Sequence, residues 1–166
     1  MARILKILSE RKKENQKGAS AVEFAIIALV FITLIFAIIE FALMVYNKQI
    51  ITNSAREGAR YGIVFRSEGQ RIPITDTTNP DTGQFTKGIN TVVLNYCENL
   101  LISFGSSEPE INISRAHDNN GTENIFTNTA CEFSEDYLIV EVSYDYDFLF
   151  IPLATQLSSI ARMRCE

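Results

Sequence analysis

The sequence predicts an α+β protein with a long N-terminal helix, a second helix and a small antiparallel sheet. Three observations support this fold class. Residues 24–46 form an apolar run long enough to cross a bilayer. Residues 89–104 repeat their apolar positions at helical spacing, and residues 140–150 alternate between apolar and polar side chains. The 166 residues provide one folded domain in addition to the apolar helix.

Residues 1–18 form a short basic leader. They carry a net charge of +4, whereas the rest of the chain carries −9. Nucleic-acid binding is not expected, because the leader is too short for a domain and the acidic remainder would repel phosphate. The leader instead indicates a topogenic signal, since basic flanks stay on the cytoplasmic side of a membrane.

Residues 19–46 are predicted to form a transmembrane helix. Apart from Glu40, residues 24–46 carry no charge, and at ~1.5 Å per residue they span roughly 34 Å. Small residues precede this run instead of following it, so the helix is expected to be retained and not removed as a signal peptide. Glu40 is interpreted as an interfacial, solvated carboxylate, with a contact to Lys48 or Arg56 of a neighbouring copy as the alternative.

The helix is expected to extend beyond the membrane over residues 47–65, which contain no proline and keep helical spacing. Small residues gather on one face of this extension, which allows another backbone to approach closely. We interpret this face as the surface on which the globular part packs. The alternative is an interface between two helices. The members of the face are Ser54, Ala55, Gly58, Ala59 and Gly62.

Residues 66–166 are predicted to form an exported α+β domain. It begins with a surface loop, in which residues 76–83 are dense in turn formers. An amphipathic helix follows from Ile89, carries Cys97 on its apolar face and is closed by Gly105.

Three strands are predicted to complete this domain, at 110–115, 140–150 and 159–166. The second strand alternates as a half-buried strand does and is ended by Pro152. Its acidic face, with Glu141, Asp145 and Asp147, is interpreted as solvated, and a calcium ion or a basic partner is the alternative.

Cys97, Cys131 and Cys165 all follow the apolar run and are expected on the exported side, where oxidation lets two of them pair. Three cysteines allow three single bridges, and the sequence does not choose between them. We expect a Cys97–Cys131 disulfide with Cys165 free near the C-terminus. Three unpaired buried thiols are the alternative.

Enzymatic chemistry is not expected. The single histidine, His117, lies in a polar loop, and the chain has no nucleophile elbow, phosphate-binding glycine loop or zinc-ligand spacing. Residues 118–121 lack the spaced carboxylates of a calcium-binding loop. We therefore predict no catalytic residue, no cofactor and no metal.

Gly18, Ala19 and Glu23 carry the chemistry that the sequence does predict. A carboxylate at the mouth of an apolar helix is costly unless it is paired. Cleavage after Gly18 would create the partner, because the freed α-amine of Ala19 lies one helical turn from Glu23 and is largely charged near neutral pH. Glu23 is then expected to pair with the amine of an adjacent subunit. A carboxylate that only snorkels to the lipid headgroups is the alternative.

Two blocks of the sequence resemble the TadE-like family, the pseudopilin-type proteins of Tad (Flp) pilus assembly. They are Gly18-Ala19-Ser20-Ala21-Val22-Glu23-Phe24 and Ala55-Arg56-Glu57-Gly58-Ala59-Arg60-Tyr61-Gly62, and the segment that they bound is about a quarter of the chain. A third, looser block is the late alternating strand with the ending Met163-Arg164-Cys165-Glu166. The resemblance implies a pilin-like fold, cleavage by a prepilin peptidase at Gly18–Ala19, and a role as a minor subunit or assembly factor. Phe24, where the major pilin usually has tyrosine, and the large exported part argue against the major pilin.

The resemblance also implies the partners and the location of the protein. The partners are the prepilin peptidase, other Tad/Flp pilus subunits, the inner-membrane assembly platform and the lipid bilayer. The location is the bacterial inner membrane, crossed once, with the N-terminus cytoplasmic and the C-terminal domain periplasmic or incorporated into the pilus. A permanently membrane-anchored periplasmic interaction protein that is never polymerised is the alternative.

Overall fold

The computed structural model describes residues 2–64, 72–78, 80, 83, 85–102, 108–116, 129–131, 136–150 and 154–165, with side chains from Gly18 onward. The described elements confirm the α+β class. The chain divides into two units, Met1–Phe41 and Ala42–Glu166. The first unit consists of helix alone, and the second contains the rest of that helix, a second helix and all described strands.

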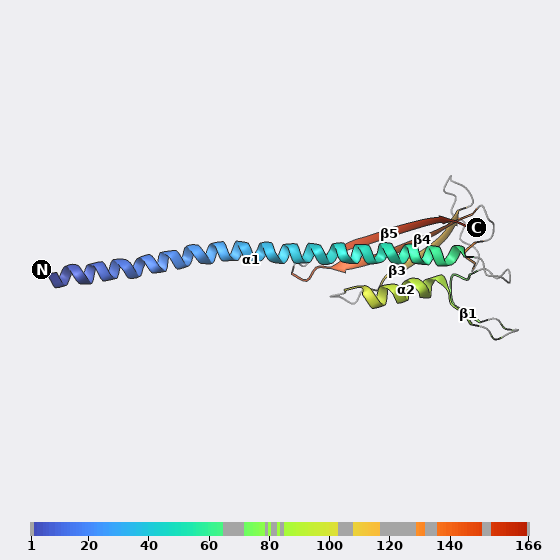
Figure 1. Cartoon of the computed structure of the whole chain (residues 1–166), viewed down its shortest axis with the longest axis horizontal. Coiled ribbons are helices and arrows are strands. Elements are labelled where there is room, and N and C mark those ends of the chain that lie inside the picture. Colours follow the sequence, from blue (N-terminus) through green and yellow to red (C-terminus); the bar gives the residue numbers. More distant parts are fainter. Residues whose placement is uncertain are drawn as a thin grey trace. The chain divides into compact units, whose positions relative to one another are not determined.

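Helix α1 runs without interruption from Ala2 to Ile63 (Figure 1). The C-terminal end of α1 at Ile63 agrees with the predicted extension over residues 47–65. The leader is also helical, which was not predicted from the sequence. The leader is rich in Lys, Arg, Leu and Ile, most of which have high helix propensity, so their propensities offset the cost of about 1 kcal/mol that a single glycine imposes.

The second unit adds α2 and two small sheets to residues 42–63 of α1. Strands β1 and β2 pair as a short antiparallel ribbon, and β3, β4 and β5 form an antiparallel sheet in that order. The elements are α2 (Ile89–Leu100), β1 (Thr77–Thr78), β2 (Phe85–Thr86), β3 (Glu110–Ala116), β4 (Tyr137–Asp147) and β5 (Ala154–Arg164).

Both helices pack on the same face of the three-stranded sheet. The inward side chains of β4 meet the apolar face of α2 and the small-residue face of α1, and these residues form one core. From α2 the core takes Ile89, Val93 and Cys97, and from β4 it takes Leu138, Val140, Val142, Tyr144 and Tyr146.

The predicted elements exist, but several boundaries differ. Helix α2 ends at Leu100, before the predicted end at Gly105, and the backbone N–H of Leu101 donates to the carbonyl of Cys97 (2.8 Å). The last strand is longer than predicted, because β5 pairs with β4 over its full length, from Ala154 to Arg164. The predicted strand-ending residue, Pro152, lies outside the described residues.

The small-residue face of α1 packs within its own chain. Ala55 and Ala59 are fully buried. A Cβ added at Gly58 would overlap the side chain of Val93 on α2, and one added at Gly62 would lie 2.7 Å from Cδ1 of Ile89. The absence of side chains at these two positions lets α2 and β4 approach the helix closely.

The disulfide joins Cys131 to Cys165, so the predicted Cys97–Cys131 pair is wrong. The sequence interpretation treated Cys165 as the end of a tail. In the structure, β5 carries it to a fixed place, where its N–H donates to the carbonyl of Asp136 (2.8 Å) and its Cα lies 5.9 Å from that of Cys131. Cys97 is free and fully buried on the inward face of α2, as an apolar core residue.

Candidate functional site

The residues that the sequence predicts as a cleavage and pairing site lie on one exposed stretch of α1. Gly18, Ala19 and Glu23 are exposed, and Phe24 is 73% exposed. Apart from the adjacent residues and the backbone of the helix itself, no described atom lies within 4 Å of the position that a Cβ at Gly18 would take. Positions 19 and 23 are four residues apart on a helix, which separates them by about 6 Å along its axis. The helix therefore brings the Ala19 nitrogen and the Glu23 carboxylate to adjacent turns.

The stretch that follows is apolar around the whole helix. Its large apolar side chains, from Phe24 to Phe41, are exposed on every side. Among the described residues, the candidate membrane span is Gly18–Ile63, with a mean hydropathy of 2.9 in its most apolar window. A helix with large exposed apolar side chains around its axis lacks the broad polar face of a surface helix. This segment is compatible with a single-pass membrane anchor.

Glu40 departs from the interpretation made from the sequence. Its side chain is 3% exposed, so the prediction of a solvated carboxylate is wrong. Lys48, which was considered as its partner in a neighbouring copy, donates instead from Nζ to the backbone carbonyl of Ser158 on β5 of the same chain.

Asn47 is a structural residue that sequence reasoning missed. Its side chain is fully buried, its Nδ2 donates to the carbonyl of Ile102 (2.7 Å), and its Oδ1 accepts from the N–H of Ile102 (3.1 Å). The sequence did contain a signal. Asn47 is spaced four and seven residues before Ile51 and Ser54, which places it on the buried face of α1.

The block between Ala55 and Gly62 combines two kinds of residue. Its small members are buried against α2 and β4, whereas Arg56, Glu57 and Arg60 are exposed. The packing face that the sequence predicted is therefore occupied within the chain, and the charged side chains of the block point away from the core.

Residues 18–60 match the TadE-like protein family. The match confirms the resemblance over the segment that runs from the proposed cleavage site to the small-residue face. No curated protein and no solved structure matches the chain. The sheet and α2 lie outside this TadE-like segment, so their features come from the structure alone.

Outside the TadE-like segment, Asp76 fixes the start of α2. Its Oδ1 accepts from the backbone N–H of Gly88 (2.6 Å) and from Oγ1 of Thr91 (2.7 Å). The hydrogen bond from Gly88, followed by that from Thr91, lowers the pKa of the Asp76 carboxyl below its ordinary value. Gly88 is the N-cap residue of α2 and has no side chain of its own to cap it, so Asp76 supplies the carboxylate from the preceding loop.

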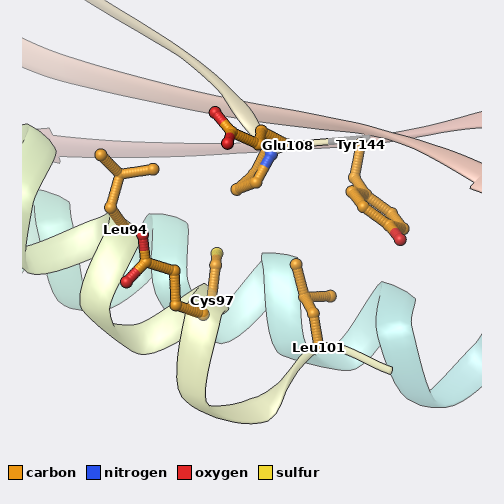
Figure 2. A pocket seen from close by; sticks show the side chains of 7 residues that line it. Leu94, Cys97, Leu101, Glu108 and Tyr144 are labelled. Carbon is orange, nitrogen blue, oxygen red and sulfur yellow. The ribbon is translucent and has the colours of Figure 1, made fainter. Parts of the chain in front are cut away.

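A pocket of about 230 Å³ also lies outside the TadE-like segment, between α2 and the sheet. Figure 2 shows Leu94 and Cys97 on α2, and Leu101 just after it, facing the pocket, with Glu108 and Tyr144 on its other side. Burial raises the pKa of the Cys97 thiol. A thiol held in its protonated form is a poor nucleophile, and the side chains that line the pocket include no histidine to activate it.

Within the described part of the chain, no group of three or more His, Cys, Asp or Glu residues is arranged to hold a metal ion. His117 and residues 118–121, which entered the sequence argument against catalysis and calcium binding, lie outside the described residues.

Proposed function

We propose that this chain is a minor pilin-like subunit or assembly factor of a Tad (Flp) type IV pilus. A prepilin peptidase cuts it between Gly18 and Ala19, and the mature protein packs through α1. The match to the TadE-like family suggests involvement in Tad pilus assembly and contact with other pilus components. The observation that carries the proposal is that the TadE-like segment begins at the proposed cut and continues into a helix with an exposed apolar surface.

The mature protein first resides in the inner membrane. Residues 19–46 cross the bilayer, the leader stays in the cytoplasm and the sheet domain is periplasmic. The basic leader supports this orientation, because basic residues are retained on the cytoplasmic side. The exposed apolar side chains between Phe24 and Phe41 support insertion, because lipid or neighbouring helices would cover them.

Cleavage hydrolyses the Gly18–Ala19 peptide bond. The leader leaves with a new carboxylate on Gly18, and Ala19 gains a charged α-ammonium group. The backbone must open locally for a peptidase to hold it in an extended form. Gly18 lowers the cost of opening, because glycine is about 1 kcal/mol less favourable than alanine inside a helix. The exposure of this stretch of α1 leaves it accessible to the enzyme.

Glu23 then sets the axial position of each subunit. Its carboxylate pairs with the Ala19 ammonium of an adjacent subunit when helices pack side by side. An unpaired charge at the centre of a membrane helix costs about 2.5–3.5 kcal/mol on insertion scales, and less near the interface. A helix shifted out of register would lose the pair and leave both charges among apolar side chains.

The experiment that tests this function compares Glu23→Gln with Asp145→Asn. Each substitution removes one carboxylate, but Asp145 lies exposed on β4, far along the chain from the cleavage site. We expect Glu23→Gln to insert and be cleaved normally but to form few pili, whereas Asp145→Asn assembles as the unmodified protein does. Normal piliation with Glu23→Gln would show that assembly does not need the Glu23 carboxylate, and would contradict the proposed ion pair.

A permanently anchored periplasmic interaction protein is the second candidate. The observation that favours it is that residues 42–166 build their core from their own α1, α2 and sheet. An exported domain of this kind needs no neighbouring subunit to fold. The two candidates differ in cleavage, since an anchored protein keeps its leader.

A further inference from the structure

The connection between β4 and β5 carries an exposed apolar tip. Leu149 and Phe150 are each 48% exposed, and they follow Phe148, which is half-buried. The next three residues, 151–153, are also apolar in sequence. No charged residue occurs between Asp147 and Arg162, so the stretch that contains the tip has no charge of its own that would favour its exposure to water.

The contacts of β4 fix where this tip lies along α1. Leu138 meets α1 at Gly62 and Val140 meets it at Gly58, so β4 runs antiparallel to the helix. A strand advances about 3.3 Å per residue and a helix about 1.5 Å, so one strand residue matches roughly two helix residues. Asp147, the last residue of β4, is therefore level with helix residues 42–44.

The packing of the core agrees with this alignment. Leu43 and Met44 of α1 and Phe148 all pack against the same hydrophobic core. The ring of Phe148 lies edge-on to the ring of Tyr146, with 5.2 Å between centroids. β4 therefore ends beside the first residues of α1 that belong to the second unit, and the tip follows directly after β4. Residues 42–46 of the helix belong to the predicted transmembrane segment.

We propose that Leu149 and Phe150, immediately beyond the end of β4, insert into the interfacial layer of the periplasmic leaflet. The proposal rests on the proposed function only in that α1 crosses the membrane. Lipid is the occupant that the structure favours over a second copy, because β4, which the tip follows, ends level with helix residues 42–44 of the predicted transmembrane segment. The tip also carries no charge to select a protein partner. Insertion would hold the exported domain at the membrane surface until the subunit leaves the bilayer.

The chain contains no tryptophan, so one introduced indole reports on one position. The full chain carrying Phe150→Trp would be reconstituted in phosphatidylcholine–phosphatidylglycerol vesicles containing lipids brominated near the top of the acyl chain. Phe31→Trp, within the apolar run, and Ile160→Trp, on β5, are the matched references, because these positions are 60% and 63% exposed. Leu149→Trp provides a second probe of the tip if Phe150→Trp does not fold.

We expect brominated lipid to quench Phe150→Trp and Phe31→Trp and to leave Ile160→Trp unquenched, with the Phe150→Trp emission shifted to the blue. If brominated lipid quenches Phe31→Trp but not Phe150→Trp, α1 crosses the membrane but the tip does not insert, and the proposal is wrong. An unquenched blue shift of Phe150→Trp that grows with the protein-to-lipid ratio assigns the tip to a second copy and also overturns the proposal. Absence of quenching at Phe31→Trp overturns the anchor itself, and the inserted tip with it.

Discussion

Asn47 and Ile102 form a two-hydrogen-bond clamp that joins α1 to the segment after α2. The Asn47 side chain donates to the Ile102 carbonyl (2.7 Å) and accepts from the Ile102 N–H (3.1 Å), although the residues are 55 positions apart in sequence. Because Asn47 is fully buried, water cannot easily replace its side chain in these bonds. The clamp holds the second helix against the first at the end opposite Asp76.

We expect Asn47→Ala to lower the free energy of unfolding by about 2 kcal/mol, because it leaves a backbone donor and acceptor of Ile102 without these partners. Asn53→Ala is the matched control, since Asn53 is exposed on the same helix, and it should change stability by less than about 0.5 kcal/mol. Urea unfolding of the full chain in detergent, followed by circular dichroism, measures both. Equal effects of the two substitutions would show that the clamp adds nothing.

Gly58→Ala tests the close approach between α1 and α2. Helix propensity alone predicts a gain of about 1 kcal/mol, but the added methyl overlaps the Val93 side chain, and overpacking of this kind costs about 1–3 kcal/mol. We therefore expect net destabilisation. The double variant Gly58→Ala/Val93→Ala should lose less free energy of unfolding than the two single variants lose in sum, because the shortened side chain at position 93 leaves room for the added methyl group. A stabilising Gly58→Ala would contradict the packing described.

The three cysteines should differ in their reactivity towards an alkylating reagent. The thiol of Cys97 has a pKa raised by burial, so little thiolate is present near neutral pH. Alkylation of the native protein should label no cysteine, and alkylation after unfolding without reductant should label Cys97 alone. Non-reducing peptide mass mapping should then find Cys131 linked to Cys165. A peptide linking Cys97 to Cys131 would restore the pairing expected from the sequence.

The hydrogen bonds of Asp76 should stabilise the fold at neutral pH and lose this effect in acid. Its folded-state pKa is lowered by the hydrogen bonds from Gly88 and Thr91, so the stabilisation is fully present above the ordinary value of 3.8 and is lost as pH falls through the folded pKa. Asp76→Asn should therefore be less stable than the unmodified protein at neutral pH, and the difference should shrink in acid. Thermal melts from pH 7 down to pH 2 measure this, and a constant difference would contradict it.

The sequence predicted the elements whose patterns are local. The apolar run, the helical spacing after Ile89 and the alternation after Val140 each identify an element without knowledge of its partners. The TadE-like segment was also identifiable, because its motifs are contiguous. What the sequence interpretation lacked was the length of β5, since a strand paired along one side with β4 need not show strong alternation of its own.

Non-local features were predicted less well. The disulfide depends on where β5 ends relative to residues 129–131, and no local pattern encodes that distance. Asn47 was passed over because its partner is a backbone group of Ile102, which has no signature in sequence. Glu40 was assigned to solvent from its position along the run, and that position does not reveal that its side chain is only 3% exposed.

Gly18→Leu tests the cleavage site by substitution. A large side chain would hinder close approach to the backbone and stabilise the helix locally, so we expect the precursor to accumulate in cells with an active prepilin peptidase. Ala42→Leu, an equally bulky change at an exposed position of α1, should be processed normally. Efficient processing of Gly18→Leu would place the cut elsewhere.

In the proposed function, cleavage after Gly18 frees a charged amine one helical turn from Glu23. The most direct test is the intact mass and N-terminal peptide of the unmodified protein, purified from membranes of cells that contain an active prepilin peptidase. We expect a mature chain that begins at Ala19. A chain that retains Met1 and the leader would contradict this expectation and favour the permanently anchored alternative.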